Sequence, residues 1–393
     1  MDFQTLNPKP RTLLFIAGDV SGDIHSARLA RTILERHPDW IIYVVGGTQL
    51  GAIAQEFPNV HFLGDTSGYG VIGFASAVAI YPRVLQLRQQ VLKWLQSHSI
   101  DAAVLCDWGA FNGRLLPNLK ERGIPVLYYF PPRSWQKTGA GGLGIVPFVT
   151  RVATPFEWSA QRLTKAGCQA EWVGHPLLEY VRPSRPREAL RREFGVSDDS
   201  PLVALLPGSR AMELRYIAPH MVQAAQRLRA QRPIHFVAAV PQGVTARARQ
   251  YFPSWIPLVE GRAADVLLAC DAALVKSGTA TLEAAVADAP QIVVYDVPWL
   301  LRMQWHLTGM TKKVPFVVMP NIILERAAVP ELLGDNCRAV PIYNALKGLL
   351  DNAARRQQMR EDYALVRRAL GSNLPFAATE RTADILCEML ASR

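Results

Sequence analysis

Two short segments of the C-terminal half combine small residues, hydroxyl side chains and charges in a pattern suited to binding phosphate. The first is KSGTATLE at residues 276–283, between a predicted buried strand and a predicted helix. The N–H groups at a helix N-terminus favour an anion, and small residues let it approach the backbone. Glu283, one turn into the helix, is placed to hold two ribose hydroxyls. The candidate ligands are Ser277, Gly278, Thr279, Ala280, Thr281 and Glu283; the alternative is an ordinary helix cap with Glu as its partner.

The second segment is LPGSR at residues 206–210, again at a predicted strand-to-helix junction. Gly208 permits an unusual turn, and the guanidinium of Arg210 can bind a phosphate through two hydrogen bonds. The alternative is a solvated arginine in a turn. Two such loops in one half favour an anion site more strongly than either loop does alone. The candidate residues from this loop are Gly208, Ser209, Arg210 and Glu213.

Two loops of the N-terminal half also follow predicted strands. Residues 18–23, GDVSGD, do not match the dinucleotide pattern GxGxxG, and they predict a glycine-lined loop facing a ligand. Its candidate residues are Gly18, Ser21, Gly22 and Asp23; the alternative is a tight turn with Asp23 as a helix cap.

Asp107 ends a buried strand and is a candidate general base, with Asn112 beyond it. The alternative is that Asp107 caps the helix that begins near Phe111.

The elements that carry these loops alternate between strand-like and helix-like patterns, which predicts parallel α/β sheets. A helix is predicted from Asp23 to Glu35, with apolar residues at helical spacing. Prolines at 176, 183 and 186, in a basic stretch, predict a hinge. Strands are predicted at 13–17, 41–45, 102–106, 125–129, 151–153, 171–173, 202–206, 235–239, 272–275 and 291–295.

This pattern predicts two α/β domains with ligands in a cleft between them. The N-terminal domain is expected at 1–178 and a linker at 179–200. The C-terminal domain is expected at 201–375, followed by a helix at 376–393 that packs back on the N-terminal domain.

The composition limits the classes of partner that the protein is expected to bind. The formal net charge of +10 favours a phosphate, an acidic membrane surface or a nucleic acid. The basic residues are dispersed and no aromatic-plus-basic RNA motif occurs, which argues against nucleic acid. Five scattered cysteines without zinc-type spacing predict reduced thiols in a cytosolic protein. No apolar run reaches the roughly 18 residues of a membrane span, so any membrane contact is expected to be peripheral.

Two segments mix apolar and basic residues and are candidate surfaces for an anionic membrane or an acylated ligand. The uncharged residues 70–80 lead into a basic segment with an apolar stripe at helical spacing, Val84, Leu87, Val91 and Leu95. Residues 299–307 are followed by Lys312 and Lys313. The alternative for both is a core-facing helix with solvated charges.

Eight stretches, in this order, resemble the lipid-A-disaccharide synthase family and span nearly the whole chain. They are residues 18–23, 69–73, 107–112, 129–135, 173–177, 206–213, 277–283 and 319–333. SGTATLE and LPGSR with its later Glu are specific as a pair, and VGHP at 173–176 adds weight. The resemblance implies an α/β fold of the GT-B type, two Rossmann-like domains with parallel sheets facing across a cleft.

The resemblance also implies a reaction. Members join UDP-2,3-diacylglucosamine to 2,3-diacylglucosamine 1-phosphate and release UDP, with inversion and without a cofactor or an active-site metal. It implies an acylated UDP-sugar and an acylated sugar phosphate as partners, peripheral contact at the inner face of the cytoplasmic membrane, and a homodimer as a further expectation. Asp107 matches the presumed base, and Arg210, Glu213, residues 277–283 and Asn321 match donor-side positions. Asn112, Trp135 and Arg326 are expected on the acceptor or cleft side, with the loop at 18–23.

The sequence departs from the family mainly in its N-terminal half. Asp19 replaces the usual Glu, Ser76 stands where Glu is expected, and Ala110 replaces a second Asp. Residues 131–137 keep only the Pro and Trp of the usual segment, and the Gly-Arg-Glu expected after Asn321 is altered. Two alternatives therefore stay open, a diverged transferase with another acceptor and a UDP-sugar epimerase on the same fold. The net charge leaves a third, a non-catalytic protein that binds glycolipid or nucleic acid.

Overall fold

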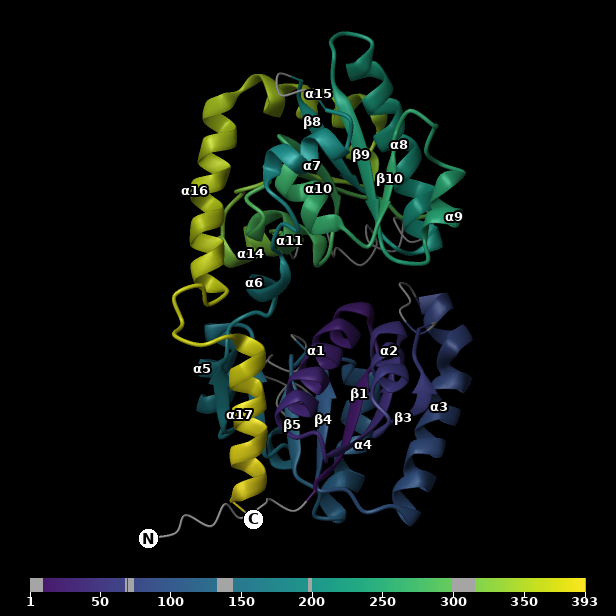
Figure 1. Cartoon of the computed structure of the whole chain (residues 1–393), viewed down its shortest axis with the longest axis vertical. Helices are drawn as coiled ribbons and strands as arrows, with labels where there is room; N and C mark the ends of the chain where they lie inside the picture. Colours follow the sequence, from purple (N-terminus) through teal and green to yellow (C-terminus); the bar gives the residue numbers. More distant parts are fainter. Residues whose placement is uncertain are drawn as a thin grey trace. The chain divides into compact units, whose positions relative to one another are not determined.

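The computed structural model describes residues 10–67, 69, 74–132, 144–196, 200–298 and 315–392, with only the backbone of 74–79. The chain folds as two compact units (Figure 1). The first contains the residues up to Pro176 and those from Asn373 onward, and the second contains Leu177 to Ser372.

The first unit is built on a parallel sheet of seven described strands in the order β3-β2-β1-β4-β5-β6-β7. Its strands are β1 (Thr12–Ala17), β2 (Ile41–Gly46), β3 (Val60–Asp65), β4 (Ala102–Cys106), β5 (Val126–Tyr129), β6 (Arg151–Thr154) and β7 (Ala170–Trp172). Its helices are α1 (Val20–Arg36), α2 (Thr48–Glu56), α3 (Phe74–Ser97), α4 (Gly109–Glu121), the 3-10 turn η2 (Val146–Phe148), α5 (Glu157–Lys165) and α17 (Ala378–Ala391).

The central strand β1 is buried on both faces, as expected for a parallel sheet between helical layers. Leu13 and Phe15 pack into one core together with residues of α1, α2 and α17. Leu14 and Ile16 pack into the other core with residues of α3 and α4. Because successive side chains of β1 point to opposite faces of the sheet, this strand contributes to the core on each face.

Helix α17 comes from the C-terminal end of the chain and lies alongside α1 in the first unit (Figure 1). Its Leu386 and Met389 enter the core beneath α1. Arg381 donates to both carboxylate oxygens of Glu171, at 2.5 and 2.9 Å, and Arg36 of α1 bonds Asp384 at 2.7 Å. The helix is therefore a structural part of this unit.

The second unit repeats the architecture with six described strands in the order β10-β9-β8-β11-β12-β13, all parallel. The strands are β8 (Leu202–Leu206), β9 (His235–Val240), β10 (Leu258–Glu260), β11 (Ala272–Lys276), β12 (Gln291–Tyr295) and β13 (Glu331–Leu333). The helices are α6 (Leu177–Tyr180), α7 (Arg187–Glu193), α8 (Ala211–Arg229), α9 (Thr245–Arg249), α10 (Ala263–Ala269), α11 (Ala280–Val286), α14 (Met319–Leu324), the 3-10 turn η3 (Gly334–Asn336), α15 (Ala339–Asp351) and α16 (Ala353–Ala369).

The stretch expected as a linker, 179–200, is largely packed onto the second unit. The guanidinium of Arg191 on α7 is buried and donates to the carbonyl of Ala269 at 3.0 Å and to Asp271 at 3.1 Å. Its other nitrogen donates to the carbonyl of Ser200 at 2.7 Å. The bonds to Ala269 and Asp271 could not be predicted from the proline-rich local sequence, because they join α7 to residues about 80 positions away.

Several predicted boundaries differ from the structure. Helix α1 begins at Val20 rather than Asp23, because the carboxylate of Asp19 accepts the N–H of Gly22 and caps the helix. Strands β3, β10 and β13 were not predicted; each lies at an edge of its sheet and is only partly buried.

The apolar stripe predicted as a membrane surface is instead part of the core. Leu87, Val91 and Leu95 of α3 are buried against the first sheet. The other candidate segment, residues 299–307 with Lys312 and Lys313, lies outside the described residues and so stays a prediction. Within the described part of the chain, no helix has the length and apolar character needed to cross a membrane.

Candidate active site

The strand orders of both units place the predicted loops at equivalent positions. In each sheet the order reverses next to the first strand, between β1 and β4 and between β8 and β11. Ligands of open α/β sheets bind beyond the carboxyl ends of the strands at such a switch point. The loops predicted from the sequence follow these four strands, at residues 18–23, 107–112, 207–213 and 276–283.

The loop after β8 is shaped by one buried carboxylate. Glu213 is 2% exposed and accepts the backbone N–H groups of Ser209 at 3.0 Å and Arg210 at 3.2 Å. Gly208 has φ of +102°, and a methyl group there would lie 2.2 Å from the carboxylate. Glu213 therefore holds the loop that carries the partly exposed Arg210, and its predicted contact with a ligand stays a prediction.

Lys276, at the end of β11, connects this loop to the next one. Its ammonium lies 2.7 Å from Glu213, and Arg210 bonds the same carboxylate oxygen at 3.4 Å. Lys276 was not among the predicted ligands, although it begins the segment at residues 276–283. The sequence feature that could have indicated a role is a charged residue at the end of an apolar strand, because a nearly buried cation needs a partner.

The loop after β11 holds itself together through its own polar groups. The hydroxyl of Thr281 donates to the carbonyl of Gly278 at 2.8 Å and is buried, so Thr281 supports the loop rather than facing solvent. Gly278 has φ of +142° and is exposed, and Ser277, Thr279 and Ala280 are partly exposed. The backbone around Gly278 and the side chains of Ser277 and Thr279 are therefore the parts open to a ligand.

Glu283 lies one turn into α11 with its carboxylate largely desolvated. Burial raises its pKa to about 7. Among the described residues no hydrogen bond or ion pair to this carboxylate is found. A carboxylate held in this way can accept hydrogen bonds from a ligand that supplies two hydroxyls.

Two other predicted site residues of the second unit are occupied by protein contacts. The buried side chain of Asn321 accepts the N–H of Val329 at 2.8 Å and donates to Glu331 at 2.8 Å. Arg326, expected on the acceptor or cleft side, lies in the second unit, and its half-exposed side chain pairs with the buried Asp362 of α16 at 2.7 Å. Both side chains hold α14 and the turn after it, and their predicted ligand contacts stay predictions.

Asp107 in the first unit directly follows β4 and has a strained backbone, with φ of +45°. Its carbonyl accepts a hydrogen bond from the amide of Asn112 at 2.8 Å and another from the hydroxyl of Tyr128. Its N–H points to the carbonyls of Tyr129 and Phe130, both at 3.2 Å. Four neighbours thus fix this backbone, and Asn112 is one of them.

Burial raises the pKa of Asp107 to about 7, and the negative charge of Asp19 adds to the shift. A carboxyl group with this pKa exchanges its proton near neutral pH, as a general base requires. Asp107 does not cap α4; the residue before that helix is Trp108, which is also left-handed and makes no side-chain cap.

Trp108 closes one side of this region. Its ring stacks on Phe111 with a centroid separation of 4.2 Å and lies 5.9 Å from Tyr69. A methyl group at Gly18 would lie 1.9 Å from the indole. Gly18 is therefore needed for the close packing of two loops, a reason different from the ligand contact that was predicted.

The loop after β1 is also internally bonded. The hydroxyl of Ser21 donates to Asp19 at 2.7 Å, and a methyl group at Gly22 would lie 2.5 Å from the same carboxylate. Asp23 is buried and accepts the N–H groups of Gly47 and Gln49, both at 2.8 Å. Asp23 therefore holds the start of α2. It does not cap its own helix, since Asp19 does, and its predicted ligand contact stays a prediction.

A buried aromatic cluster supports the backbone beside Asp107. The ring of His25 stacks on Phe130 at 4.4 Å, and His175 meets both rings edge-on. Burial lowers the pKa of His25 to about 3, so this imidazole is neutral. Trp135, the remaining predicted site residue, lies outside the described residues.

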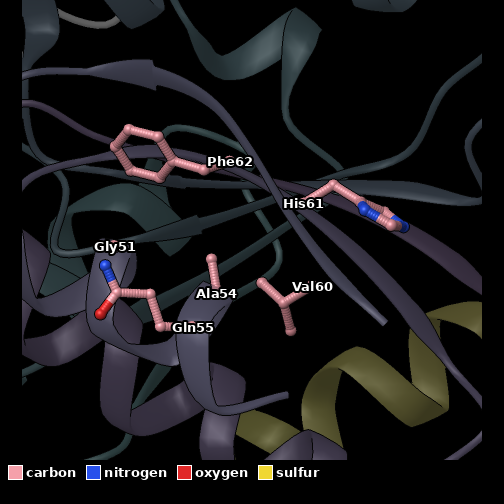
Figure 2. A pocket seen from close by; sticks show the side chains of 6 residues that line it. All are labelled: Gly51, Ala54, Gln55, Val60, His61 and Phe62. Atoms are coloured by element: carbon pink, nitrogen blue, oxygen red, sulfur yellow. The ribbon is translucent and has the colours of Figure 1, made fainter. Parts of the chain in front are cut away.

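A depression of about 430 Å³ lies elsewhere, at the edge of the first sheet (Figure 2). Figure 2 shows His61 and Phe62 of β3 beside Gly51, Ala54 and Gln55 of α2. β3 is the strand farthest from β4 on that side of the sheet, so this depression is separate from the loops at the switch point. No group of three or more His, Cys, Asp or Glu side chains suited to a metal ion was found among the residues described.

Comparison with known proteins identifies the family. A sequence model of the lipid-A-disaccharide synthetase family matches residues 13–384. The chain therefore belongs to the lipid-A-disaccharide synthase family. The lipid-A-disaccharide synthase of Myxococcus xanthus is 35% identical over 390 residues, covering 97% of this chain and 98% of the relative. That of Burkholderia pseudomallei strain 1710b is 32% identical over 384 residues, covering 96% and 97%.

Solved structures share the fold at low sequence identity. A Staphylococcus aureus MnaA–UDP structure superposes with a TM-score of 0.65 at 14% identity, covering 97% of each chain. MurG of Acinetobacter baumannii gives a TM-score of 0.58 at 16% identity, covering 96% of this chain and 99% of MurG. The calicheamicin glycosyltransferase CalG4 gives 0.57 at 16% identity, covering 98% and 99%. This member of the lipid-A-disaccharide synthase family thus has the GT-B fold that was predicted, with two parallel α/β domains.

Proposed function

We propose that the protein transfers 2,3-diacylglucosamine from its UDP derivative to 2,3-diacylglucosamine 1-phosphate, giving the disaccharide 1-phosphate of lipid A and UDP. The observation that carries this proposal is family membership over almost the entire chain. The placement of all four predicted loops at the two switch points supports it, because these are the ligand positions of such sheets.

In the proposed reaction Asp107 is the general base. Its carboxylate takes the proton of the acceptor hydroxyl while the hydroxyl oxygen bonds to the anomeric carbon of the donor. The bond from that carbon to the UDP oxygen breaks, and its electron pair leaves with UDP. One such displacement inverts the anomeric configuration. The raised pKa of Asp107 supports this role, since a base with a pKa near 7 accepts a proton effectively at neutral pH.

The departing UDP gains negative charge, which the second unit is suited to stabilise. We assign the diphosphate to Arg210 and the exposed backbone around Gly278, and the ribose to Glu283. Fixed cations and N–H groups directed at developing charge lower the barrier because they need no reorganisation. In this proposal they act without a metal ion or a cofactor.

The function is tested by incubating the protein with both acylated substrates and measuring the product by mass spectrometry. A disaccharide 1-phosphate formed together with UDP is expected, and an Asp107→Asn sample serves as the matched control. Release of UDP only with a different acceptor would favour a diverged transferase. UDP-sugar epimerisation without transfer would contradict the proposal.

We further propose that the protein works at the inner face of the cytoplasmic membrane, through peripheral contact, and as a homodimer. The charge of +10 and the exposed Tyr81 and Arg83 of α3 support contact with an anionic surface. In co-sedimentation we expect binding to vesicles that contain anionic lipid, but not to neutral vesicles. The oligomeric state is tested separately by sedimentation analysis, where a monomer would contradict the homodimer.

Replacing Glu283 with Gln is expected to weaken the binding of both UDP and uridine by roughly tenfold or more, because a charged acceptor for the ribose hydroxyls is lost. The wild-type affinity should also increase as pH rises through about 7, where this carboxyl loses its proton, and this dependence should be smaller in the variant. Calorimetric titration at pH 6 and 8 measures both effects. The exposed Glu361→Gln variant is the control, and equal uridine affinity in Glu283→Gln and wild type would refute the ribose contact.

Replacing Tyr128 with Phe is expected to lower kcat several-fold with KM unchanged, because Asp107 loses one of the bonds that fix its carbonyl. The free energy of unfolding should fall by about 1 kcal/mol, the usual contribution of one hydrogen bond. Steady-state kinetics and denaturant unfolding measure the two effects. Tyr43→Phe on β2 removes a hydroxyl from the same sheet as a control, and wild-type kcat in Tyr128→Phe would show that this bond does not position the base.

A further inference from the structure

Lys276 carries a positive charge at the switch point of the second sheet, and none of the roles proposed above uses it. It is the last residue of β11, and its side chain is only 16% exposed. Its one ion pair among the described residues is with Glu213, at 2.7 Å. Its ammonium also lies 5.9 Å from the centre of the Tyr295 ring.

The charges around Glu213 do not balance. Among the described residues that pair with Glu213, Arg210 and Lys276 contribute two positive charges against its one negative charge, so one positive charge remains. The carboxylate already accepts two backbone N–H groups and the guanidinium of Arg210. Glu213 therefore has enough donors without Lys276, and the remaining charge is available to an anionic ligand.

The position of the ammonium relative to Gly278 points to where such a ligand lies. A methyl group on Gly278 would be 3.2 Å from the Lys276 nitrogen. Gly278 has no side chain, is exposed, and has φ of +142°, so the space beside the ammonium is open. An anion that contacts the backbone of Gly278 is then also within reach of Lys276.

We propose that Lys276 is a second phosphate-binding cation, which contacts the diphosphate of the nucleotide-sugar together with Arg210. The inference rests on the proposed function, because it assumes that UDP occupies this loop. A lysine acts on phosphate as a compact point charge, whereas an arginine binds through a planar pair of N–H groups. Two cations of different geometry offset the growing charge of the leaving UDP better than Arg210 alone.

The competing explanation is that Lys276 only neutralises Glu213 and holds the two loops together. The two explanations differ in their effect on ligands. A phosphate contact affects nucleotides but not the nucleoside. A purely structural lysine, when removed, disturbs the whole loop and affects uridine, UMP and UDP alike.

The test is calorimetric titration of uridine, UMP and UDP into wild-type protein and the Lys276→Met variant. The variant is expected to bind UDP roughly tenfold to a hundredfold more weakly, with uridine affinity unchanged. The Lys276→Arg variant should recover part of the UDP affinity. Equal losses for uridine and UDP, or no loss for UDP, would overturn the inference.

A double variant keeps the test decisive if Lys276→Met alone fails to fold. Lys276→Met with Glu213→Gln removes both charges of the pair, and the Gln oxygen still accepts the loop N–H groups. The same selective loss of UDP affinity is expected in it. Lys347→Met on the exposed face of α15 is the matched control, because it also removes a lysine paired with a carboxylate. Absence of UDP binding to wild-type protein would instead refute the proposed function.

Discussion

Replacing Asp107 with Asn is expected to lower turnover by roughly a hundredfold to ten-thousandfold, the usual contribution of a general base. The affinity for UDP should stay at the wild-type level, because Asp107 belongs to the first unit and the assigned nucleotide contacts belong to the second. Asparagine keeps the shape of the side chain but cannot take a proton. Steady-state kinetics of disaccharide formation and titration with UDP measure the two quantities. Turnover near the wild-type value would exclude Asp107 as the base.

The pH dependence gives an independent check on the same residue. The base acts in its deprotonated form, so kcat/KM of the wild-type protein should rise as pH increases through about 7 and then level off. The residual activity of Asp107→Asn should lack this step. Asp39→Asn, which removes an exposed carboxylate from the same unit, should keep it.

Stability should change in the opposite direction to activity. The folded-state pKa of Asp107, about 7, is higher than the value of about 4 in an unfolded chain. The charged carboxylate therefore destabilises the fold, with a cost that is absent below pH 4 and complete above pH 7. Asp107→Asn should unfold at a higher temperature than wild type at pH 8, with a smaller difference at pH 5. Thermal unfolding at both pH values shows whether lost activity comes from lost structure.

Replacing Arg210 with Ala is the second change with a large expected effect. Turnover should fall by roughly a hundredfold to a thousandfold, the size expected when one fixed donor to developing charge is removed. UDP affinity should fall as well, because the guanidinium is assigned to the diphosphate. The loop itself should survive, since Glu213 holds it through the backbone of Ser209 and residue 210 rather than only through the side chain.

The control for Arg210→Ala is Arg215→Ala, in the helix α8 that begins directly after Arg210, with a side chain exposed to solvent. It should leave turnover and UDP affinity within about twofold of wild type, as expected for a surface substitution. Unchanged turnover in Arg210→Ala would remove the leaving-group role, and equal losses in both variants would point to a general charge effect.

The sequence predicted the central architecture because buried parallel strands leave a strong local signal. Strands β1, β4, β8 and β11 were predicted within about one residue, and with them the four loops. The edge strands β3, β10 and β13 were missed because they are short or partly exposed and their sequences mix polar with apolar residues.

The roles of individual polar residues were harder to predict than their positions. A polar side chain after a strand has the same local pattern whether it meets a ligand or the backbone of another element. Asp23 bonds N–H groups that are 24 and 26 residues away, and Asn321 bonds Val329 and Glu331. Such partners depend on tertiary packing, so neither the local spacing used for Asp23 nor the family resemblance used for Asn321 could predict them.

The return of α17 to the first unit has a consequence for how the protein is made. Residues 378–391 leave the ribosome after the whole of the second unit, yet Leu386 and Met389 complete the core beneath α1. During translation the first unit therefore has an exposed apolar face while about 200 further residues are synthesised. A nascent chain in this condition is a natural client for chaperones that shield exposed apolar surface.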